Sequence, residues 1–565
     1  MKKQLLALAV LTAGIANAQT WSENFNSTTP PTLPTSWSQN NLDALPTNTA
    51  IASYSFAANA WVTHNVSTST DPAMSSHGKV AVSTSYYVQT GSTNASVVTS
   101  NDWLITPSFS VPANGVITWE ANAPDASFQD GYLVKISTTG TATTNFSTTL
   151  LTVAAENSTW TSHSINLNAY AGQTVYISFI NNSVDMDILY LDNVQVIVPA
   201  SNDILMSAVG PTGQASWGAN GSNATISGTV TNNGYNNITS FTAKYFVGGA
   251  PVSQIFSGLN LAYGQTYGFN FTTPYTITST SQTLVKVWAD LTGDVIHTND
   301  TLKAYLKGYS FVPNHKVVFE EGTGTWCGWC VRGAVYMDSM YLVNPNTTAL
   351  IAVHNSSSDP MTNTIYDAGV GTLIQGYPTA LCDRSVVIDD PSTMFTSYSN
   401  HINDFGLADI TLTPTYNTTS RVANVLVNTH IAASFPNNTA TNDYRLAVVF
   451  TEMGVTGTAS GYAQHNYYSF ASQNLPLVGA GHNWQNEAAI VPATSMKYDF
   501  VARTILGGFT GQSNSLPNAL VAGATYTSSV FSYTVPAAYN AGNMRVHALL
   551  IDAKNNIIYN ANTTT

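Results

Sequence analysis

The sequence predicts a multidomain, mainly β protein that contains one α/β segment. Short alternating runs of apolar and polar residues, such as Gly115–Glu120 and Thr174–Ile180, recur between turn residues along most of the chain. Only 8% of the residues are charged, compared with about 25% in ordinary soluble proteins, and Asn, Thr, Ser, Gly and Tyr take their place. Between Phe311 and Phe405 the pattern changes, because strand-like runs alternate with helical ones there.

Length, charge and cysteine content limit what kind of protein this is. At about 150 residues per domain, 565 residues suggest three to five domains. The net charge of −13 is spread over the whole chain and makes a weak field, which argues against binding to nucleic acid or anionic lipid. Three cysteines are few for an exported protein of this size, so we do not expect a disulfide-based scaffold.

The N-terminus has the pattern of a secretory signal peptide. A charged start is followed by an apolar stretch from Leu5 to Ile15 and by the small-x-small pattern Ala16-Asn-Ala18. A membrane-spanning helix would need about 20 apolar residues, and no other stretch of the chain has them. We expect residues 1–18 to be removed, which leaves no membrane-spanning segment. The mature chain would reach the outer membrane, the cell surface or the exterior of a Gram-negative bacterium.

The first predicted domain, residues 19–200, has the strand pattern of a jelly-roll β-sandwich. Three of its phrases are Trp21-Ser-Glu-Asn-Phe25, Asn101-Asp-Trp-Leu-Ile-Thr-Pro107 and Leu189-Tyr-Leu-Asp-Asn-Val194. Together they resemble the cleaved-adhesin, or choice-of-anchor J, family of bacterial surface modules. The resemblance implies a carbohydrate-module-like jelly roll that often holds a structural calcium ion.

Two acidic residues of this domain are candidates for calcium binding. Glu23 and Asp192 lie in the two end segments that pair in such folds, and hard oxygen ligands there would suit Ca²⁺. The alternative is that both are ordinary polar residues at strand ends. We expect no other cofactor anywhere in the chain.

The second predicted domain, residues 201–308, is an Ig-like β-sandwich. Asn223–Asn233 alternates as a strand does and is followed by Gly234, which makes a tight-turn sequence. Leu284–Trp288 is a second strand-like run. The layout resembles immunoglobulin-like modules of the bacterial adhesion-related type, and a spacer is the role that we expect.

The third predicted domain, residues 309–408, carries the one motif with evident chemistry. Lys316–Glu320 suits a buried strand, a turn follows, and Cys327-Gly-Trp-Cys330 opens a helix that Asn344-Pro345 ends. A cysteine at a helix N-terminus is stabilised as the thiolate, which is the attacking species in disulfide exchange. Cys330 is close enough to resolve a mixed disulfide.

Two other interpretations of the motif are open. A structural disulfide is one, although closing a four-residue loop stabilises a protein by only about 2 kcal/mol. Half of a zinc site is the other, but the chain has no second cysteine pair.

The motif resembles the active site of the thioredoxin superfamily. Trp326 precedes the first cysteine as it does in that family, and Glu321 occupies the place of a buried acid that moves the proton of the resolving thiol. Pro378 matches the cis-proline of the loop that faces the site. The resemblance implies a thioredoxin-like α/β domain, yet Trp329 stands where thioredoxin has proline. The direction of electron transfer is therefore open.

The stretch from Phe319 to Gly333 is closer still to a second group. It resembles the Omp-twenty-eight-related outer-membrane family, and Ile351-Ala-Val-His354 and Val449-Phe-Thr-Glu452 agree with that resemblance. The resemblance covers about Val312 to the end of the chain. It implies a thioredoxin-like domain joined to a C-terminal β-sandwich, which we assign to residues 409–565.

Three further features have open interpretations. His354 would end a strand parallel to the one before Cys327, either as a proton carrier beside the thiols or as a polar strand-end residue. Cys382 is either a buried unpaired thiol or a partner for intermolecular exchange. Gly461–Asn486 is predicted to be a loop, and its aromatic and histidine side chains either pack on one another or form a metal or sugar platform.

Two functions follow from this organisation. The first is thiol–disulfide exchange on extracytoplasmic proteins: Cys327 attacks, Cys330 resolves, Glu321 carries a proton, and Pro378 aligns the substrate. This hypothesis makes the protein a thiol–disulfide oxidoreductase. The second is surface adhesion, in which β modules bind proteins or surface glycans and the thioredoxin-like module is a scaffold with a structural disulfide.

Overall fold

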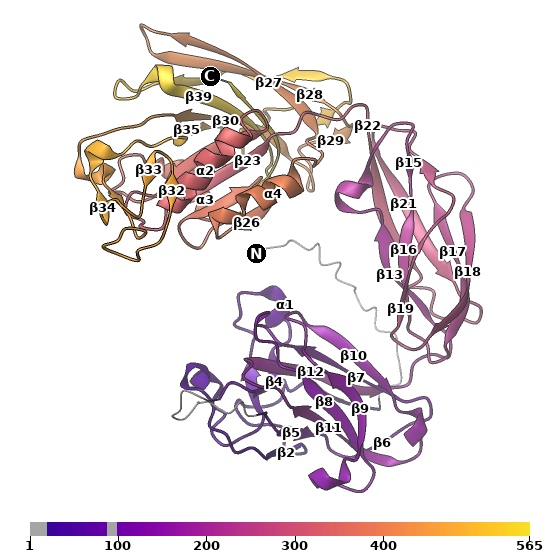
Figure 1. The fold of residues 1–565 in the computed structure, drawn as a ribbon. Coiled ribbons are helices and arrows are strands. Elements are labelled where there is room, and N and C mark those ends of the chain that lie inside the picture. Colours follow the sequence, from indigo (N-terminus) through magenta and orange to yellow (C-terminus); the bar gives the residue numbers. More distant parts are fainter. Residues whose placement is uncertain (1–19, 88–98, 565) are drawn as a thin grey trace.

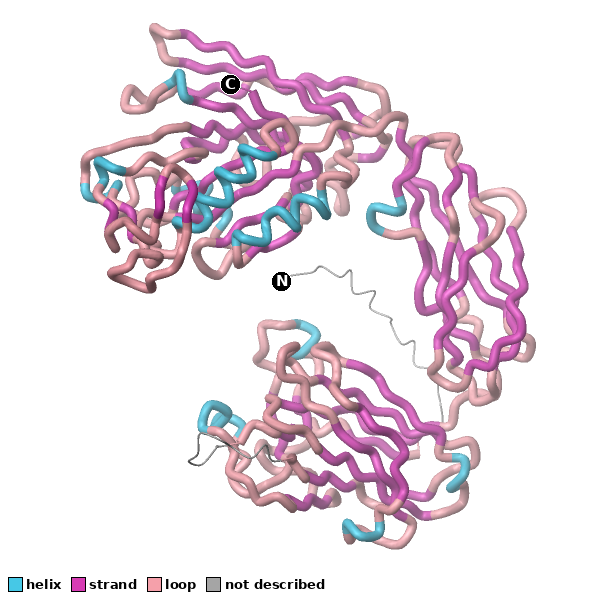
Figure 2. Tube along the Cα trace, viewed as in Figure 1, coloured by secondary structure: helices cyan, strands magenta, loops and turns pink. Residues whose placement is uncertain are grey.

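The computed structural model describes residues 20–87 and 99–564, and strands account for most of its regular structure (Figure 2). The prediction of a multidomain, mainly β protein is confirmed. The predicted signal peptide lies outside the described residues. Within them, no helix combines the length and the apolar character needed to cross a bilayer.

The N-terminal module is a sandwich of two antiparallel sheets (Figure 1). One sheet contains β1 (Trp21–Glu23), β3 (Val62–Asn65), β4 (Lys79–Thr84), β7 (Val116–Asn122), β10 (Thr161–Asn166) and β12 (Ile188–Ile197). The other contains β2 (Ser38–Asn41), β5 (Asp102–Ile105), β6 (Phe109–Ser110), β8 (Tyr132–Ser137), β9 (Thr148–Val153) and β11 (Thr174–Asn181). A short helix, α1 (Pro72–Ser75), precedes β4. Apolar residues at alternate positions of the strands fill the space between the sheets, with Trp61, Trp119 and Phe179 fully buried.

The second module is a smaller sandwich with Ig-like form. Its five-stranded sheet has the order β14-β22-β21-β17-β18, and β13-β16-β19 packs against it. The strands are β13 (Ile204–Gly210), β14 (Trp217–Ala219), β15 (Asn223–Ala224), β16 (Ser227–Asn232), β17 (Ile238–Phe246), β18 (Val252–Leu261), β19 (Thr266–Asn270), β20 (Tyr275–Thr276), β21 (Gln282–Asp290) and β22 (Thr301–Tyr309). The predicted turn after β16 forms as expected, because the Asn232 side chain accepts a hydrogen bond from the Gly234 amide.

The C-terminal body is built on one eight-stranded sheet with the order β26-β25-β23-β24-β35-β30-β39-β40. Its strands are β23 (Val317–Thr323), β24 (Thr348–His354), β25 (Thr379–Cys382), β26 (Val386–Ile388), β30 (Tyr444–Glu452), β35 (Val501–Leu506), β39 (Met544–Asp552) and β40 (Ile557–Thr564). Strands from both sides of residue 408 therefore share a single sheet.

Three helices cover the first half of this sheet on its two faces. They are α2 (Val331–Val343), α3 (Thr364–Val370) and α4 (Met394–His401). Met337 of α2 and Met394 of α4 pack on one face with Phe319, whereas Tyr366 of α3 packs on the other face with Val318. Because both faces are covered, β23 and β24 are buried at every position.

A second sheet completes the body beyond the helices. It contains β27 (Ala408–Asn417), β28 (Val422–Ile431), β37 (Thr525–Thr527) and β38 (Phe531–Thr534), and it packs on β30 and β39. Three two-residue pairs lie in the connecting segments: β29 (Phe435–Pro436) with β36 (Ala519–Leu520), β31 (Gln464–His465) with β34 (Ile490–Val491), and β32 (Val478–Gly479) with β33 (His482–Asn483).

The first prediction concerns a fully buried ion pair in the eight-stranded sheet. Arg384 donates from Nε to Oε2 of Glu320 over 2.6 Å, and neither side chain is exposed. Replacing Arg384 with Met leaves a buried carboxylate without its partner, so we expect the free energy of unfolding to fall by about 3–5 kcal/mol. Urea titration measures the change.

The matched control is Arg332→Met. Arg332 pairs with Asp390 at 2.8 Å, but both side chains are partly exposed, and exposed pairs contribute about 0–1 kcal/mol. Equal losses in the two variants would contradict the assignment of the buried pair as a major source of stability.

Candidate functional site

Cys327 and Cys330 form a disulfide in the turn between β23 and α2. The predicted order of strand, turn and helix is confirmed, and α2 ends at Val343 with Asn344 as its cap. The position of Cys327 differs from the expectation. The helix begins at Val331 with Cys330 as its N-cap, so Cys327 lies in the preceding turn, where its carbonyl accepts a hydrogen bond from the Cys330 amide.

The disulfide is buried, although the side chains beside it are not. Cys327 is 5% exposed and Cys330 is 2% exposed, whereas Trp326 and Trp329 are 40% and 39% exposed. An attacking thiolate must reach a sulfur atom along the S–S axis. The closed structure leaves almost no sulfur surface for that approach.

A segment far away in the chain covers the disulfide turn. We call residues 464–468 the covering segment. Gln464 donates from Nε2 to the carbonyl oxygens of Cys327 at 3.0 Å and Gly324 at 3.4 Å. The His465 amide donates to the Thr325 carbonyl at 2.8 Å, and the Tyr467 amide donates to the Gly328 carbonyl at 3.0 Å. The carbonyl groups of the turn are thus paired with the covering segment.

Aromatic packing adds to this cover. The Trp329 ring meets the rings of Tyr467 and Tyr468 edge to face, with centroids 5.4 and 5.5 Å apart. Gly328 makes the approach feasible, because a Cβ atom there would lie 2.5 Å from the Tyr467 ring. Trp484, in the same long connection, is buried with Val331 of α2. The connection packs on the helix, an arrangement that neither interpretation of Gly461–Asn486 included.

Glu321 lies in β23, with its side chain on the α2 side of the sheet. Gly333 of α2 leaves room for its carboxyl group, since a Cβ atom there would collide with Oε1. Burial raises the pKa of Glu321 to about 8. Oε1 has no hydrogen-bond partner among the described residues. The group is therefore predominantly a neutral acid at pH 7.

A small cavity of about 50 Å³ joins Glu321 to Cys330. His354 also lines it, and Asp338 and Lys497 line it nearer the surface. Such a volume admits a few water molecules at most. The structure thus brings three of the predicted site residues, Glu321, Cys330 and His354, to one cavity.

His354 ends β24, which runs parallel to β23 as predicted. Its Nδ1 lies 2.8 Å from Oδ2 of Asp359, and the same oxygen accepts a hydrogen bond from the Thr325 amide. Burial acts to raise the pKa of Asp359, but these bonds outweigh it and lower that pKa. Asp359 and Gln464 were not among the predicted site residues, because only their tertiary contacts distinguish them from ordinary polar residues.

The other candidate residues lie outside this cavity. The Tyr377–Pro378 peptide is cis, the isomer that the sequence predicted, and the Tyr377 ring meets Trp326 edge to face at 5.5 Å. Pro378 is not among the residues that line the cavity. Cys382 is a buried free cysteine on β25, and burial raises the pKa of its thiol.

The two predicted calcium ligands have separate partners. Asp192 Oδ2 lies 2.8 Å from Nδ1 of His77, and Glu120 lies 3.9 Å from the same nitrogen. Glu23 Oε1 instead accepts a hydrogen bond from the Phe25 amide. Calcium binding by Glu23 and Asp192 stays a prediction.

Comparison with known families assigns the first two modules. Residues 23–196 match the model of the Cleaved Adhesin Domain, and residues 211–304 match that of CARDB. Residues 23–196 are therefore similar to cleaved-adhesin modules. The first match supports the resemblance predicted for that segment, and the CARDB match supports an Ig-like module in the second.

Similar proteins share single modules with this chain. Hemagglutinin A of Porphyromonas gingivalis is 32% identical over 126 residues, which are 19% of this chain and 6% of that protein. The chain thus spans a small fraction of the curated relative that it matches. The K1 cleaved-adhesin domain of Lys-gingipain from the same organism is 24% identical, with 31% of this chain and 96% of that domain covered and a TM-score of 0.24.

A solved structure similar to the second module is a CARDB domain from Pyrococcus furiosus in complex with di-metal ions. It is 16% identical and covers 19% of this chain and 93% of that domain, with a TM-score of 0.16.

The second prediction tests the cover over the disulfide. Replacing Gln464 with Ala removes its bonds to the disulfide turn and loosens the covering segment by about 1–2 kcal/mol. We expect dithiothreitol to reduce the Cys327–Cys330 bond roughly 5- to 30-fold faster. Mass spectrometry of alkylated thiols, sampled over time, measures the rate.

Gln473→Ala is the matched control, because Gln473 is an exposed glutamine of the same connection. The disulfide of this variant should be reduced at the wild-type rate. If Gln464→Ala is also reduced at that rate, the covering segment does not control access.

The third prediction concerns the pH dependence of stability. The pKa of Glu321 is about 8 in the folded protein, compared with 4.5 for an unburied glutamate. The contribution of Glu321 to the stability of the folded protein is therefore complete below pH 4.5 and is lost as the pH rises towards 8. Relative to Glu321→Gln, the wild-type protein should lose up to about 1.4 kcal/mol of unfolding free energy per pH unit across this range.

Urea titrations of both proteins at several pH values measure this difference. Other titrating groups are common to the two proteins and cancel. A constant difference between them would show that Glu321 does not bind its proton more tightly in the folded state.

Proposed function

We propose that this protein is an exported, surface adhesion-type binding protein whose Cys327–Cys330 unit is a scaffold. The observation that carries the proposal is the cleaved-adhesin module at residues 23–196. A curated protein that shares this type of sequence is named Hemagglutinin A. The signal-peptide pattern at residues 1–18 agrees with export.

The ligands that we propose are surface glycans or extracellular proteins. Only 8% of the residues are charged, so hydrogen bonds and aromatic contacts must supply most of the recognition. The chain has 29 Tyr, 11 Trp and 21 Phe residues for such contacts, and aromatic rings supply large contact areas. The Ig-like module would act as the spacer between the binding module and the C-terminal body.

The scaffold role rests on how the disulfide turn is enclosed. The sheet order β26-β25-β23-β24, with β23 parallel to β24 and antiparallel to β25, supports a thioredoxin-like unit. Here that half-sheet continues into β35, β30, β39 and β40. The covering segment occupies the surface at which an extended substrate would meet the cysteines. We therefore propose a structural disulfide in a unit that supports the rest of the C-terminal body.

Thiol–disulfide exchange is the second candidate. Glu321 favours it, because this residue lines the cavity with Cys330 and its raised pKa of about 8 suits it to take up and release a proton near neutral pH. In that reaction the Cys327 thiolate attacks a substrate disulfide and releases one substrate thiolate. The Cys330 thiol then gives its proton to an ionised Glu321, and its sulfur displaces the second substrate thiolate. The enzyme ends as the disulfide, and the two substrate thiolates become thiols by taking one proton from Glu321 and one from the solvent. The covering segment would have to open for the first step.

The fourth prediction separates the two candidates. In the double variant Cys327→Ser, Cys330→Ser, the adhesion hypothesis predicts unchanged binding, because the cysteines lie outside the cleaved-adhesin module. Binding is measured on a glycan array, on immobilised extracellular matrix proteins and by agglutination of erythrocytes. Loss of a four-residue loop closure should lower the unfolding free energy by about 2 kcal/mol.

The insulin-reduction assay tests the competing hypothesis of thiol–disulfide exchange. The scaffold hypothesis predicts turnover at the uncatalysed rate for both proteins. Catalysed reduction by the wild-type chain that disappears in the double variant would overturn the scaffold role and support thiol–disulfide exchange. Failure of the wild-type chain to bind any of the tested surfaces would overturn the adhesion role.

A further inference from the structure

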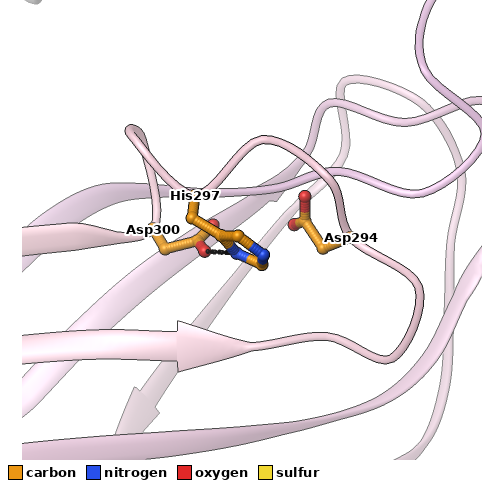
Figure 3. Close-up of side chains that lie close together, drawn as sticks. All are labelled: Asp294, His297 and Asp300. Carbon is orange, nitrogen blue, oxygen red and sulfur yellow. Dashed lines mark hydrogen bonds and ion pairs between the residues drawn. The ribbon is translucent and has the colours of Figure 1, made fainter.

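A compact group of ligand-type side chains lies in the Ig-like module, away from the disulfide. Asp294, His297 and Asp300 follow β21 and lead into β22, and one ligand atom from each lies within 4.8 Å of the others. Figure 3 shows the His297 ring between the two carboxylates.

The carboxylates of this group are buried with little positive charge to balance them. Asp294 is 8% exposed, Asp300 is 6% exposed, and the neighbouring Asp203 is 1% exposed. Among the described residues, no lysine or arginine forms an ion pair with any of the three, and His297 is the one cationic partner of Asp300. Buried carboxylates without compensation are costly, so this end of the module favours a bound cation.

One buried oxygen atom of this group lacks a binding partner. Asp300 Oδ2 lies 2.9 Å from Nδ1 of His297. Asp300 Oδ1 is buried and has no hydrogen-bond partner within the described part of the chain. A buried acceptor without a partner destabilises the folded protein, and a charged acceptor does so more strongly. A coordinated cation would supply the partner that the protein does not.

We infer that Asp294, His297 and Asp300 bind a divalent transition-metal ion of the Zn²⁺ type. Two carboxylates and one imidazole form a ligand set that zinc accepts in proteins. Calcium fits less well, because it takes six to eight oxygen ligands and this group offers an imidazole nitrogen. One ligand atom from each side chain lies within 4.8 Å of the others, so small side-chain rotations would bring them to the separation of about 3.4 Å between two ligands of a tetrahedral zinc.

The surroundings hold Asp294 in place and leave His297 free to adjust. Asp294 accepts hydrogen bonds from the Ile296 amide on Oδ1 and from the Ile204 amide on Oδ2, each at 2.8 Å. Such outer contacts orient a metal ligand, and each oxygen keeps a second lone pair for the metal. The side chain of His297 is 72% exposed, so water can complete the coordination from the solvent side.

A metal ion here would fasten the start of the module to the loop before its last strand. Ile204 begins β13, directly after the connection from the cleaved-adhesin module, and Asp294 holds its amide. Asp203 accepts hydrogen bonds from Asn233 and Asn299. The ion would therefore stiffen the point at which the two modules join, and this role does not depend on the proposed function.

The fifth prediction is zinc binding by the full-length chain. The protein is treated with a chelator, dialysed and titrated with ZnCl₂ alone by calorimetry. We expect a site with 1:1 stoichiometry whose affinity falls at least tenfold in His297→Ala and in Asp300→Asn, since loss even of outer-shell contacts weakens metal sites by about 10- to 100-fold. His297 is exposed, so its replacement should leave the fold intact.

His401→Ala is the matched control. His401 lies 2.7 Å from Asp404 in the same three-residue spacing as His297 and Asp300, but it is not part of a three-ligand group among the described residues. This variant should bind zinc as the wild-type chain does. The inference is overturned if His297→Ala and Asp300→Asn both keep wild-type zinc affinity, if no zinc binds, or if equimolar CaCl₂ displaces the zinc.

Discussion

The buried pair of Glu320 and Arg384 is the interaction on which the C-terminal body depends most. Arg384 also donates to the Phe509 carbonyl and lies over the Phe509 ring, and the Tyr366 hydroxyl donates to Glu320. These residues come from β23, the turn after β25, α3 and the segment after β35. One charged pair therefore holds together parts of the chain that no local pattern connects, and removing either partner would leave a charge in the interior.

The two adjacent glutamates of β23 illustrate how a strand separates chemical roles. Successive side chains point to opposite faces of a sheet, so Glu320 meets Arg384 on the α3 face and Glu321 meets the cavity on the α2 face. The first is paired with a cation, whereas burial without such a partner raises the pKa of the second to about 8. A buried carboxyl group beside a disulfide could transfer a proton. The same group could also be a passive part of the interior beneath the covering segment.

The covering segment connects the architecture of the C-terminal body with the scaffold role that we propose for the disulfide. The covering segment belongs to the connection between β30 and β35, and both strands extend the sheet that begins with β26 and β25. The same continuity that builds one large sheet therefore brings Gln464 and Tyr467 onto Cys327 and Gly328. In the proposed adhesion function, this arrangement would make the disulfide a structural part of the C-terminal body and would leave binding to the modules ahead of it.

The sequence by itself determined the β modules and the strand–turn–helix order around Cys327, because alternation, helix caps and short motifs are local properties. The cis form of Pro378 was implied by the resemblance to thioredoxins. The sequence placed His354 correctly at the end of β24, but Glu321 lies within β23 and not in the turn predicted after Glu320, because the strand continues to Thr323. Only the tertiary structure decided that one sheet runs across residue 408, that Gln464 covers Cys327, and that Asp294, His297 and Asp300 meet beside Asp203. These outcomes depend on contacts between distant segments or on which loop side chains turn inward. Neither produces a periodic pattern in the sequence.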